Sequence, residues 1–317
     1  MSESVVWTYL KYIHETEKFE MNSPTVVTFG KFDGVHSGHQ KLFAIVNKKA
    51  KELDALSVAV TFDKIPLSIC PSAQQHFITT NLERKEIIEN LGLDILIEYP
   101  FTEVFMHTEP EIFIEEVIAK KLRAKCVVIG PDFCFGKDRR GNADMICSYA
   151  EKYGYEAIVV EKEKYEDREI SSTFVREELK IGHMETVNML LKRPYSIKGI
   201  VVKGNQFGRT INVPTVNIYP TDCKLLPPNG VYSSETIIDG VVVYGVTNIG
   251  TKPTVNDGKN ISVETNLFNF DKYIYGKNIE VCLKHFQRPE MKFDSVETLK
   301  KQMENDAAFA KELFMIQ

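Results

Sequence analysis

The sequence lacks long apolar runs and clustered cysteines. No stretch approaches the roughly 20 apolar residues that a membrane-spanning helix requires. The 6 cysteines include no CxxC pair, which argues against a zinc site and a redox-active dithiol. Cys126, within the apolar run of residues 126–129, is expected to be a small core residue rather than a reactive thiol. The first residues include Glu3 and no apolar core, unlike a secretory signal, so we expect a cytoplasmic protein without a membrane partner.

An excess of positive charge is missing as well. The chain has 39 Lys and Arg against 44 Asp and Glu, a formal net charge of -5. Nucleic-acid binding through bulk positive charge is therefore not expected, and any phosphate site must be local. With 317 residues, of which 43% are hydrophobic and 26% charged, the chain is long and apolar enough for two globular domains.

The stretch of residues 26–40, VVTFGKFDGVHSGHQ, stands out from this ordinary background. Its apolar start predicts a buried strand that ends at Gly30, and a helical pattern begins at Gln40. His36 and His39 flank Gly38 just before that helix. Because the first N–H groups of a helix lack partners and its dipole favours negative charge, a strand, turn and helix start of this kind predict a phosphate site.

Strands alternate with helices through the first half of the chain, which is typical of a parallel sheet covered on both faces. Capping boxes are predicted at Thr80 with Glu83 and at Thr108 with Glu111, the latter followed by Pro110 in the first helical turn. The predicted strands are residues 26–29, 57–62, 94–98, 126–129 and 157–160, and the predicted helices are a segment from residue 40 and residues 80–90, 112–122 and 144–152.

The periodicity changes after two further helices, residues 171–182 and 185–191. Six short β-rich runs follow, and Asp239-Gly240 between two of them indicates a tight hairpin. A final helix, residues 295–313, carries Val296, Leu299, Met303 and Phe309, which we expect to cover one end of a barrel formed by these runs. The pattern predicts an α/β domain plus an all-β domain: a parallel-sheet domain over residues 1–183 and a six-stranded antiparallel β-barrel with a terminal helix over residues 184–317.

Two polar segments of the first half suggest phosphate chemistry. His36-Ser37-Gly38-His39 matches the HxGH signature of nucleotidylyltransferases, in which an oxygen attacks the α-phosphate of ATP and pyrophosphate leaves. A solvated loop with two incidental histidines, or a metal pair, remains an alternative. Ser171, Ser172, Thr173 and Arg176 form a second polar helix start able to hold the leaving phosphates, although an ordinary N-cap with a surface arginine is the simpler reading.

Several motifs together resemble the bacterial bifunctional riboflavin kinase/FAD synthetases. The similarity extends over nearly the whole chain and keeps the order of the motifs. The matching segments are residues 29–36, 130–136 with Arg139 and Gly141, 170–173 with Arg176, 208–209, 214–217, 230–232, 248–250 with 253–254, and 275–276.

The resemblance implies two ATP-dependent activities. A Rossmann-like nucleotidylyltransferase domain over residues 1–183 would transfer AMP from ATP to FMN, giving FAD and pyrophosphate. A riboflavin kinase barrel over residues 184–317 would convert riboflavin to FMN. The implied partners are Mg²⁺, ATP, riboflavin, FMN and FAD, without nucleic acid, in a monomer or weak homo-oligomer. A Walker GxxxxGK segment is absent from the sequence, so a P-loop kinase is not expected.

The resemblance also implies site residues. Catalytic roles would fall to His36, His39 and Arg176 in the adenylyltransferase, and to Glu264 as the base of the kinase. The ATP contacts would be Phe29, Gly30, Phe32, Asp33, Gly38, Asp132, Ser172, Thr173, Gly208 and Thr215. The flavin contacts would be Asp63, Phe133, Arg139, Gly204 and Arg288. Mg²⁺ would bind to Thr215 and Asn217, since it prefers hard oxygen ligands and keeps several waters.

Simpler interpretations and rival functions remain open. From the residues alone, Thr215 and Asn217 are a turn after Pro214, and Glu264 is a solvent-facing strand residue. The chain departs from the family at residues 64–66, KIP where Pro-His-Pro is common, and at Tyr273, where an acidic residue is usual. The alternatives are an FMN adenylyltransferase with a weak or inactive kinase barrel, and a flavin-binding sensor without catalysis.

Overall fold

The computed structural model describes residues 10–14, 16, 18–62, 76–203, 214–253 and 259–316. The chain forms two compact units, Met1–Ser172 and Thr173–Gln317, and each is described by itself. Helix α7 (Ser172–Ile181) begins at the last residue of the first unit. The predicted domain boundary between residues 183 and 184 stays a prediction.

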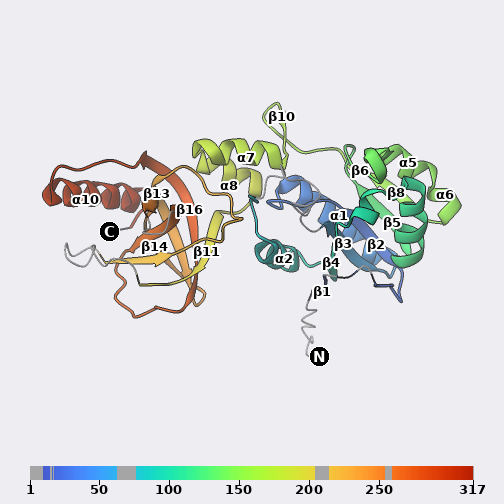
Figure 1. The fold of residues 1–317 in the computed structure, drawn as a ribbon, viewed down its shortest axis with the longest axis horizontal. Coiled ribbons are helices and arrows are strands. Elements are labelled where there is room, and N and C mark those ends of the chain that lie inside the picture. Colours follow the sequence, from blue (N-terminus) through green and yellow to red (C-terminus); the bar gives the residue numbers. More distant parts are fainter. Residues whose placement is uncertain are drawn as a thin grey trace. The chain divides into compact units, whose positions relative to one another are not determined.

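The first unit is built on a six-stranded parallel sheet with strand order β1-β4-β3-β2-β5-β8 (Figure 1). The predicted parallel sheet is confirmed, with β1 as an additional edge strand. All five residues of the central strand β2 are buried, because helices cover both faces of the sheet. The strands are β1 (Lys11–Ile13), β2 (Thr25–Phe29), β3 (Leu56–Phe62), β4 (Ile95–Tyr99), β5 (Ala124–Ile129) and β8 (Glu156–Val159).

Two apolar layers hold the helices against this sheet. Helices α1 (Ser37–Glu52) and α2 (Asn81–Asn90) pack on one face through residues such as Phe43 and Ile88. The π-helix η1 (Phe113–Lys121) and α5 (Ala143–Ser148) pack on the other face through Phe113 and Ile146. The shorter elements are α3 (Glu103–Met106), α4 (Pro110–Ile112), β6 (Cys134–Phe135), η2 (Lys137–Arg139), β7 (Gly141–Asn142), α6 (Ala150–Tyr153), β9 (Lys164–Tyr165) and β10 (Arg168–Glu169).

One predicted capping box is confirmed and the other is wrong. Thr80 Oγ1 accepts from the N–H of Glu83, whose carboxylate accepts from the N–H of Thr80. Thr108 instead donates its hydroxyl to the carbonyl of Val104 at 3.1 Å, and Val104 belongs to the preceding helix α3. The following helix begins at Pro110 after Glu109. It continues as a π-helix over η1, which sequence periodicity did not indicate.

The second unit contains a six-stranded antiparallel sheet with strand order β11-β16-β13-β14-β15-β12. Its two end strands approach each other, since the N–H of Val202 donates to the carbonyl of Asn217 at 2.9 Å in an isolated bridge. The predicted six-stranded antiparallel barrel is confirmed as this curved sheet. The elements are α8 (Met184–Leu191), β11 (Tyr195–Ile200), β12 (Thr215–Ile218), β13 (Gly230–Ile238), β14 (Val241–Pro253), β15 (Lys259–Leu267), β16 (Asn278–Pro289) and α10 (Val296–Leu313).

Asp239 and Gly240 form the predicted two-residue hairpin between β13 and β14. Their φ angles are +49° and +79°, so both adopt the left-handed conformation that a type I′ turn requires. The register of the hairpin pairs Ile238 with Val241 directly across the turn.

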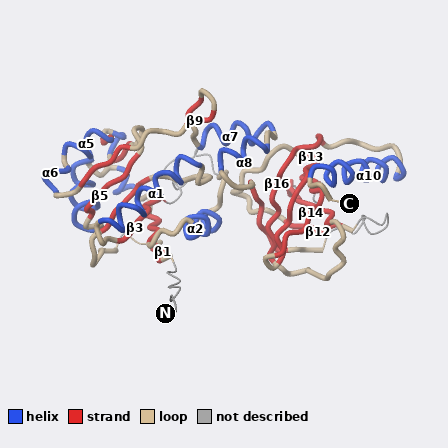
Figure 2. Tube along the Cα trace, turned by 180° about the vertical axis from the view of Figure 1, so that it is seen from behind, coloured by secondary structure: helices blue, strands red, loops and turns tan. Residues whose placement is uncertain are grey.

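Helix α10 lies against β13 and β14 (Figure 2), and only some of the residues that sequence periodicity suggested take part in its packing. Leu299 and Met303 are half-buried, and Phe309 is partly exposed but its ring contacts that of His285 on β16 at 5.2 Å. Val296 is exposed, whereas Asp306 and Ala310 are buried. Asp306 receives a two-pronged contact from Arg288 on β16, Nε to Oδ1 at 2.9 Å and Nη2 to Oδ2 at 2.6 Å. A charge pair therefore holds this helix in addition to the part of the predicted apolar face that packs on the sheet.

Cys126 is fully buried in the core of the first unit, as predicted. Burial raises the pKa of its thiol to about 11, and burial likewise raises the pKa of Cys282 in the second unit to about 12. Cys134 and Cys147 are exposed. Because the thiolate is the reactive form, a raised pKa keeps the two buried thiols, Cys126 and Cys282, protonated and unreactive at neutral pH.

Iodoacetamide at pH 8 should therefore label Cys134 and Cys147 and leave Cys126 and Cys282 unmodified. Peptide mass spectrometry after a timed reaction measures this, and the same reaction in urea should label all four. Labelling of Cys126 in the folded protein as fast as that of Cys134 would contradict the assignment of Cys126 to the core.

Replacing Asp306 by alanine should destabilise the second unit. The loss leaves the Arg288 guanidinium, only 16% exposed, without its carboxylate. Removing one partner of a buried pair typically lowers the free energy of unfolding by about 3–5 kcal/mol. Urea unfolding followed by circular dichroism measures the change. The control Glu304→Ala alters an exposed residue of the same helix, and an equal effect of both variants would refute the anchoring role of Asp306.

Candidate active sites in the two units

The loop between β2 and α1 has an unusual backbone. Phe32, Gly34 and Val35 all have positive φ angles, +48°, +81° and +42°. The left-handed region is unfavourable for a β-branched residue such as Val35 and for an aromatic residue such as Phe32, at an order of 1–3 kcal/mol each. Strain of this kind persists only where surrounding contacts hold it, and it concentrates at functional sites.

Hydrogen bonds from three other segments hold this loop. The N–H of Gly30 donates to the carbonyl of Val60 on β3 at 3.1 Å. Thr79 accepts from the N–H of Gly34 at 3.1 Å through its hydroxyl and donates its own N–H to Asp33 Oδ1 at 3.3 Å. Ser172 Oγ donates to the carbonyl of Asp33 at 2.8 Å. The predicted ATP contacts Asp33 and Ser172 are therefore adjacent, although 139 positions separate them.

The two histidines of the HxGH segment stack on each other. Their ring centroids are 3.7 Å apart with an interplanar angle of 23°, and Phe32 meets His39 edge-on at 5.2 Å. A Cβ atom at Gly38 would lie 3.3 Å from the His36 ring, so glycine permits this packing. His36 precedes the 16-residue helix α1, whose first turn contains no acidic residue. Both rings thus lie at an uncompensated positive helix end.

The loop after β5 contains Asp132 and Phe133. Asp132 is exposed and forms an ion pair with Lys162 at 3.1 Å. Phe133 stacks on Phe29 at the end of β2, with ring centroids 5.7 Å apart, and on Phe135 at 5.4 Å. The structure therefore joins the predicted residues Phe29 and Phe133 in one aromatic contact.

Further aromatic side chains gather at the carboxyl ends of β3 and β4, and sequence analysis missed them. Phe62 is the last residue of β3 and Tyr99 the last of β4. Phe105 contacts both rings, and Phe101 contacts Phe62 and Phe105. Aromatic residues that terminate neighbouring parallel strands were the signal available in the sequence, because ligands of such sheets bind at that edge.

The remaining predicted residues of the adenylyltransferase are not brought together by the structure. Arg139 is exposed in the η2 turn with a φ of +56°. Thr173 and Arg176 lie on the first two turns of α7 and belong to the second unit, so their relation to His36 and His39 stays a prediction. Asp63 lies outside the described residues, as do Gly204 and Gly208 of the predicted kinase.

In the second unit, register aligns the predicted kinase residues. Asn217 on β12 pairs with Glu264 on β15, and Glu264 pairs in turn with Asn248 on β14. Directly opposed residues of antiparallel strands point to the same face of the sheet, with Cβ atoms about 4.5–5.5 Å apart. Thr215 lies two positions before Asn217 and therefore on the same face of β12. Thr215, Asn217 and Glu264 thus form one polar group.

Asn217 carries a buried oxygen that fits a metal. The residue is only 5% exposed, and its Oδ1 has no hydrogen-bond partner among the residues that the structure describes. Leaving such a polar atom unpaired costs about 1–3 kcal/mol. An amide oxygen is a hard ligand of the kind that Mg²⁺ prefers, so the donor set suits this ion.

Arg288, predicted to contact flavin, is engaged within the protein. Its Nε and Nη2 bind to Asp306, and its Nη1 donates to the carbonyl of Pro289 at 3.0 Å. Arg288 also pairs in register with Val231, which pairs with Asn248. It therefore lies on the same strand-to-strand row as Glu264, and its flavin contact stays a prediction.

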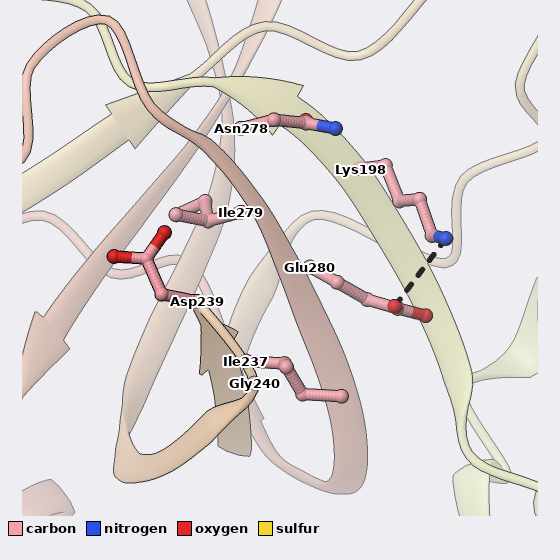
Figure 3. Close-up of a pocket in the computed structure, with 7 residues that line it drawn as sticks. All are labelled: Lys198, Ile237, Asp239, Gly240, Asn278, Ile279 and Glu280. Atoms are coloured by element: carbon pink, nitrogen blue, oxygen red, sulfur yellow. Dashed lines mark ion pairs between the residues drawn. The ribbon is translucent and has the colours of Figure 1, made fainter.

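A surface pocket of about 200 Å³ lies at the other end of β13 (Figure 3). Its charged residues are already paired, Lys198 with Glu280 at 3.4 Å and Asp239 with Lys277. Six positions of β13 separate its Ile237 from Val231, roughly 20 Å along a strand. It contains none of the predicted site residues. The lining residues are Lys198, Ile237, Asp239, Gly240, Asn278, Ile279 and Glu280.

Comparisons with known proteins match both units. A family model described as FAD synthetase matches residues 18–174, and one described as riboflavin kinase matches residues 191–314. The bifunctional riboflavin kinase/FMN adenylyltransferase of Bacillus subtilis (strain 168) is 35% identical over 94% of this chain and 96% of its own length. The chain belongs to the family of bifunctional riboflavin kinase/FMN adenylyltransferases.

Other relatives agree with this family. The bifunctional riboflavin kinase/FMN adenylyltransferase of Escherichia coli (strain K12) is 32% identical over 91% of this chain and 92% of its own. A crystal structure titled macrolide-efflux protein, from Streptococcus pneumoniae, is 31% identical with a TM-score of 0.86, over 94% of this chain and 97% of that one. In the described part of this chain, the helices are too short or too polar to cross a membrane.

The family assignment bears on the alternatives left open by the sequence. Both family models match in order, and the relatives are named for both activities. An adenylyltransferase with an inactive kinase barrel is therefore not favoured. Membership of an enzyme family likewise disfavours a flavin sensor without catalysis.

Proposed function

We infer that this protein is a bifunctional enzyme of flavin-cofactor synthesis. It phosphorylates riboflavin to FMN with ATP and transfers AMP from a second ATP to FMN, giving FAD and pyrophosphate. The observation that carries this inference is the match of both family models, in order, to residues 18–174 and 191–314. We further propose a cytoplasmic monomer or weak homo-oligomer that acts without nucleic acid, since ATP and flavins are its substrates.

In the adenylyltransferase, a phosphate oxygen of FMN attacks the α-phosphorus of ATP. The bond from that phosphorus to the bridging oxygen breaks, and its electron pair leaves with pyrophosphate. The protein must then supply donors where negative charge develops. We propose that His36, His39 and the N-terminus of α1 bind the reacting phosphates, with Phe29, Gly30, Phe32, Asp33, Gly38 and Asp132 around the nucleotide. Ser172, Thr173 and Arg176 bind the leaving pyrophosphate.

An aromatic surface supports flavin binding in the same unit. Phe133 stacks on Phe29 and Phe135, and flat rings of this kind stack on a planar ring system. Phe62, Phe101 and Phe105 extend the set along the carboxyl ends of the strands. We propose that the isoalloxazine ring of FMN binds against these side chains, with Asp63 and Arg139 as its polar contacts.

In the kinase, Glu264 acts as the general base. It takes the proton of the ribityl 5′-hydroxyl as that oxygen attacks the γ-phosphorus of ATP, and ADP leaves with the electrons of the broken bond. Thr215 and Asn217 would hold Mg²⁺, which neutralises charge on the phosphates when bound. Gly208 would contact ATP, and Gly204 and Arg288 would contact the flavin. The buried Oδ1 of Asn217, which has no hydrogen-bond partner in the described part of the chain, supports the metal assignment.

Two substitutions should separate the reactions. His39→Ala should lower FAD formation from supplied FMN about 10²–10³-fold, because it removes a donor to the reacting phosphate. It should leave FMN formation from riboflavin unchanged. Glu264→Ala should have the reverse effect, lowering FMN formation about 10²–10⁴-fold through loss of the base. Chromatography of the flavins formed with Mg²⁺ and ATP measures both products.

The exposed residues His107 and Glu304 provide matched controls, and His107→Ala and Glu304→Ala should retain both reactions. If His39→Ala or Glu264→Ala abolished both reactions in a folded protein, the two sites would not be separate. If the unmodified protein formed FAD from FMN but no FMN from riboflavin, the kinase assignment would be wrong.

Asn217→Ala should raise the Mg²⁺ concentration needed for half-maximal FMN formation by roughly tenfold or more, because an oxygen ligand is lost. FAD formation from supplied FMN should keep its Mg²⁺ dependence, since the residues proposed for that reaction do not include Asn217. A titration of each reaction with MgCl₂ measures this. Asn278→Ala, at the far end of the same sheet, is the control, and equal shifts in both variants would argue against the Asn217 assignment.

A further inference from the structure

The carbonyl oxygen of Lys31 accepts two hydrogen bonds from side chains of other elements. Thr61 Oγ1 on β3 donates to it at 3.2 Å, and Arg84 Nη1 on α2 also donates at 3.2 Å. Thr61 is fully buried and Arg84 is 4% exposed. Two buried donors thus converge on one backbone atom, within the strained loop that precedes His36.

These two donors determine the orientation of a peptide group at the proposed ATP site. Among the residues that the structure describes there are no cis peptide bonds, so the C=O of Lys31 and the N–H of Phe32 point in opposite directions. With the carbonyl turned toward Thr61 and Arg84, the N–H of Phe32 points away from β3 and α2. Phe32 has a φ of +48°, in the left-handed region. The orientation of the Lys31–Phe32 peptide therefore also affects that of the Phe32–Asp33 peptide that follows.

Stability alone does not explain Arg84. Its Nη2 forms an ion pair with Glu98 Oε1 at 3.2 Å, and Glu98 also accepts from Tyr12 and Asn81. Its Nε is buried without a hydrogen-bond partner among the described residues. An unpaired buried N–H is unfavourable, and apolar replacements of buried ion pairs are often neutral or stabilising. A positioning role accounts for a buried guanidinium at this point.

We propose that Arg84 and Thr61 are positioning residues for adenylylation. Through the Lys31 carbonyl they hold the Lys31–Phe32 peptide and the left-handed backbone after it, so that the N–H of Phe32 is directed at the phosphates of ATP. This inference rests on the proposed function of the loop as the ATP site. The guanidinium is suited to the task because its planar fork binds Glu98 and the carbonyl together.

Arg84→Lys and Thr61→Val test this role. Lysine keeps a positive charge opposite Glu98, but a single ammonium group does not reproduce the fork. Valine removes the hydroxyl donor at nearly constant volume. Each variant should lower kcat/KM for ATP in FAD formation about 10–100-fold, the effect of misplacing reacting groups slightly. The KM for riboflavin and the rate of FMN formation, which belong to the other unit, should not change.

A second readout does not need catalysis. Hydrogen exchange of the amides of residues 30–36, followed by mass spectrometry, should become faster in both variants. The control Lys49→Met breaks the exposed ion pair of Lys49 with Glu156 in the same unit, and it should leave exchange and FAD formation unchanged. If the unmodified protein makes no FAD from FMN and ATP, the proposed function fails, while the exchange data still judge the positioning role.

Two outcomes would overturn the proposal. The first is a folded Arg84→Lys or Thr61→Val protein with the kcat/KM for ATP of the unmodified enzyme. The second is unchanged exchange over residues 30–36 in both variants. A purely structural role of Arg84 predicts a lower melting temperature with normal kcat/KM, and that combination would also refute positioning.

Discussion

The first unit depends on a backbone that the chain would not adopt unaided. Phe32 and Val35 have positive φ angles in the loop that joins β2 to α1, and only contacts from elsewhere keep them there. Those contacts come from β3, from the segment around Thr79, and from Ser172. Elements distant in sequence are thus required to shape one short loop. The buried sheet beneath it provides the rigid support that a strained site needs.

In the second unit, strand pairing is sufficient to bring the candidate site residues together. Antiparallel pairing alone puts Asn217, Glu264 and Asn248 opposite one another, since register determines which side chains share a face. No unusual backbone is required at these positions. Helix α10 also depends on a polar contact, because the Arg288–Asp306 pair supplements the packing of its half-buried residues Leu299 and Met303.

Local chemistry explains where sequence analysis succeeded and where it failed. The capping box of Thr80 and Glu83 forms because both partners lie within one turn. The same spacing at Thr108 and Glu111 gives no cap, since Thr108 bonds to Val104 of the preceding helix instead. Sequence spacing identifies candidates for a local hydrogen bond, but the neighbouring element determines which hydrogen bond forms. The same limit applies to helix α10, because the periodicity of its sequence does not indicate an ion pair with a residue on a distant strand.

The sequence by itself determined the two-part fold, the succession of strands and helices along the chain, the HxGH segment and the family. These depend on periodicity and on residues close together in the chain. Only the tertiary structure decided which distant side chains meet: Ser172 with Asp33, Phe133 with Phe29, Glu264 with Asn217, and Arg84 with the carbonyl of Lys31. Such contacts require strand register and packing across a sheet. Neither is encoded in any single stretch of residues.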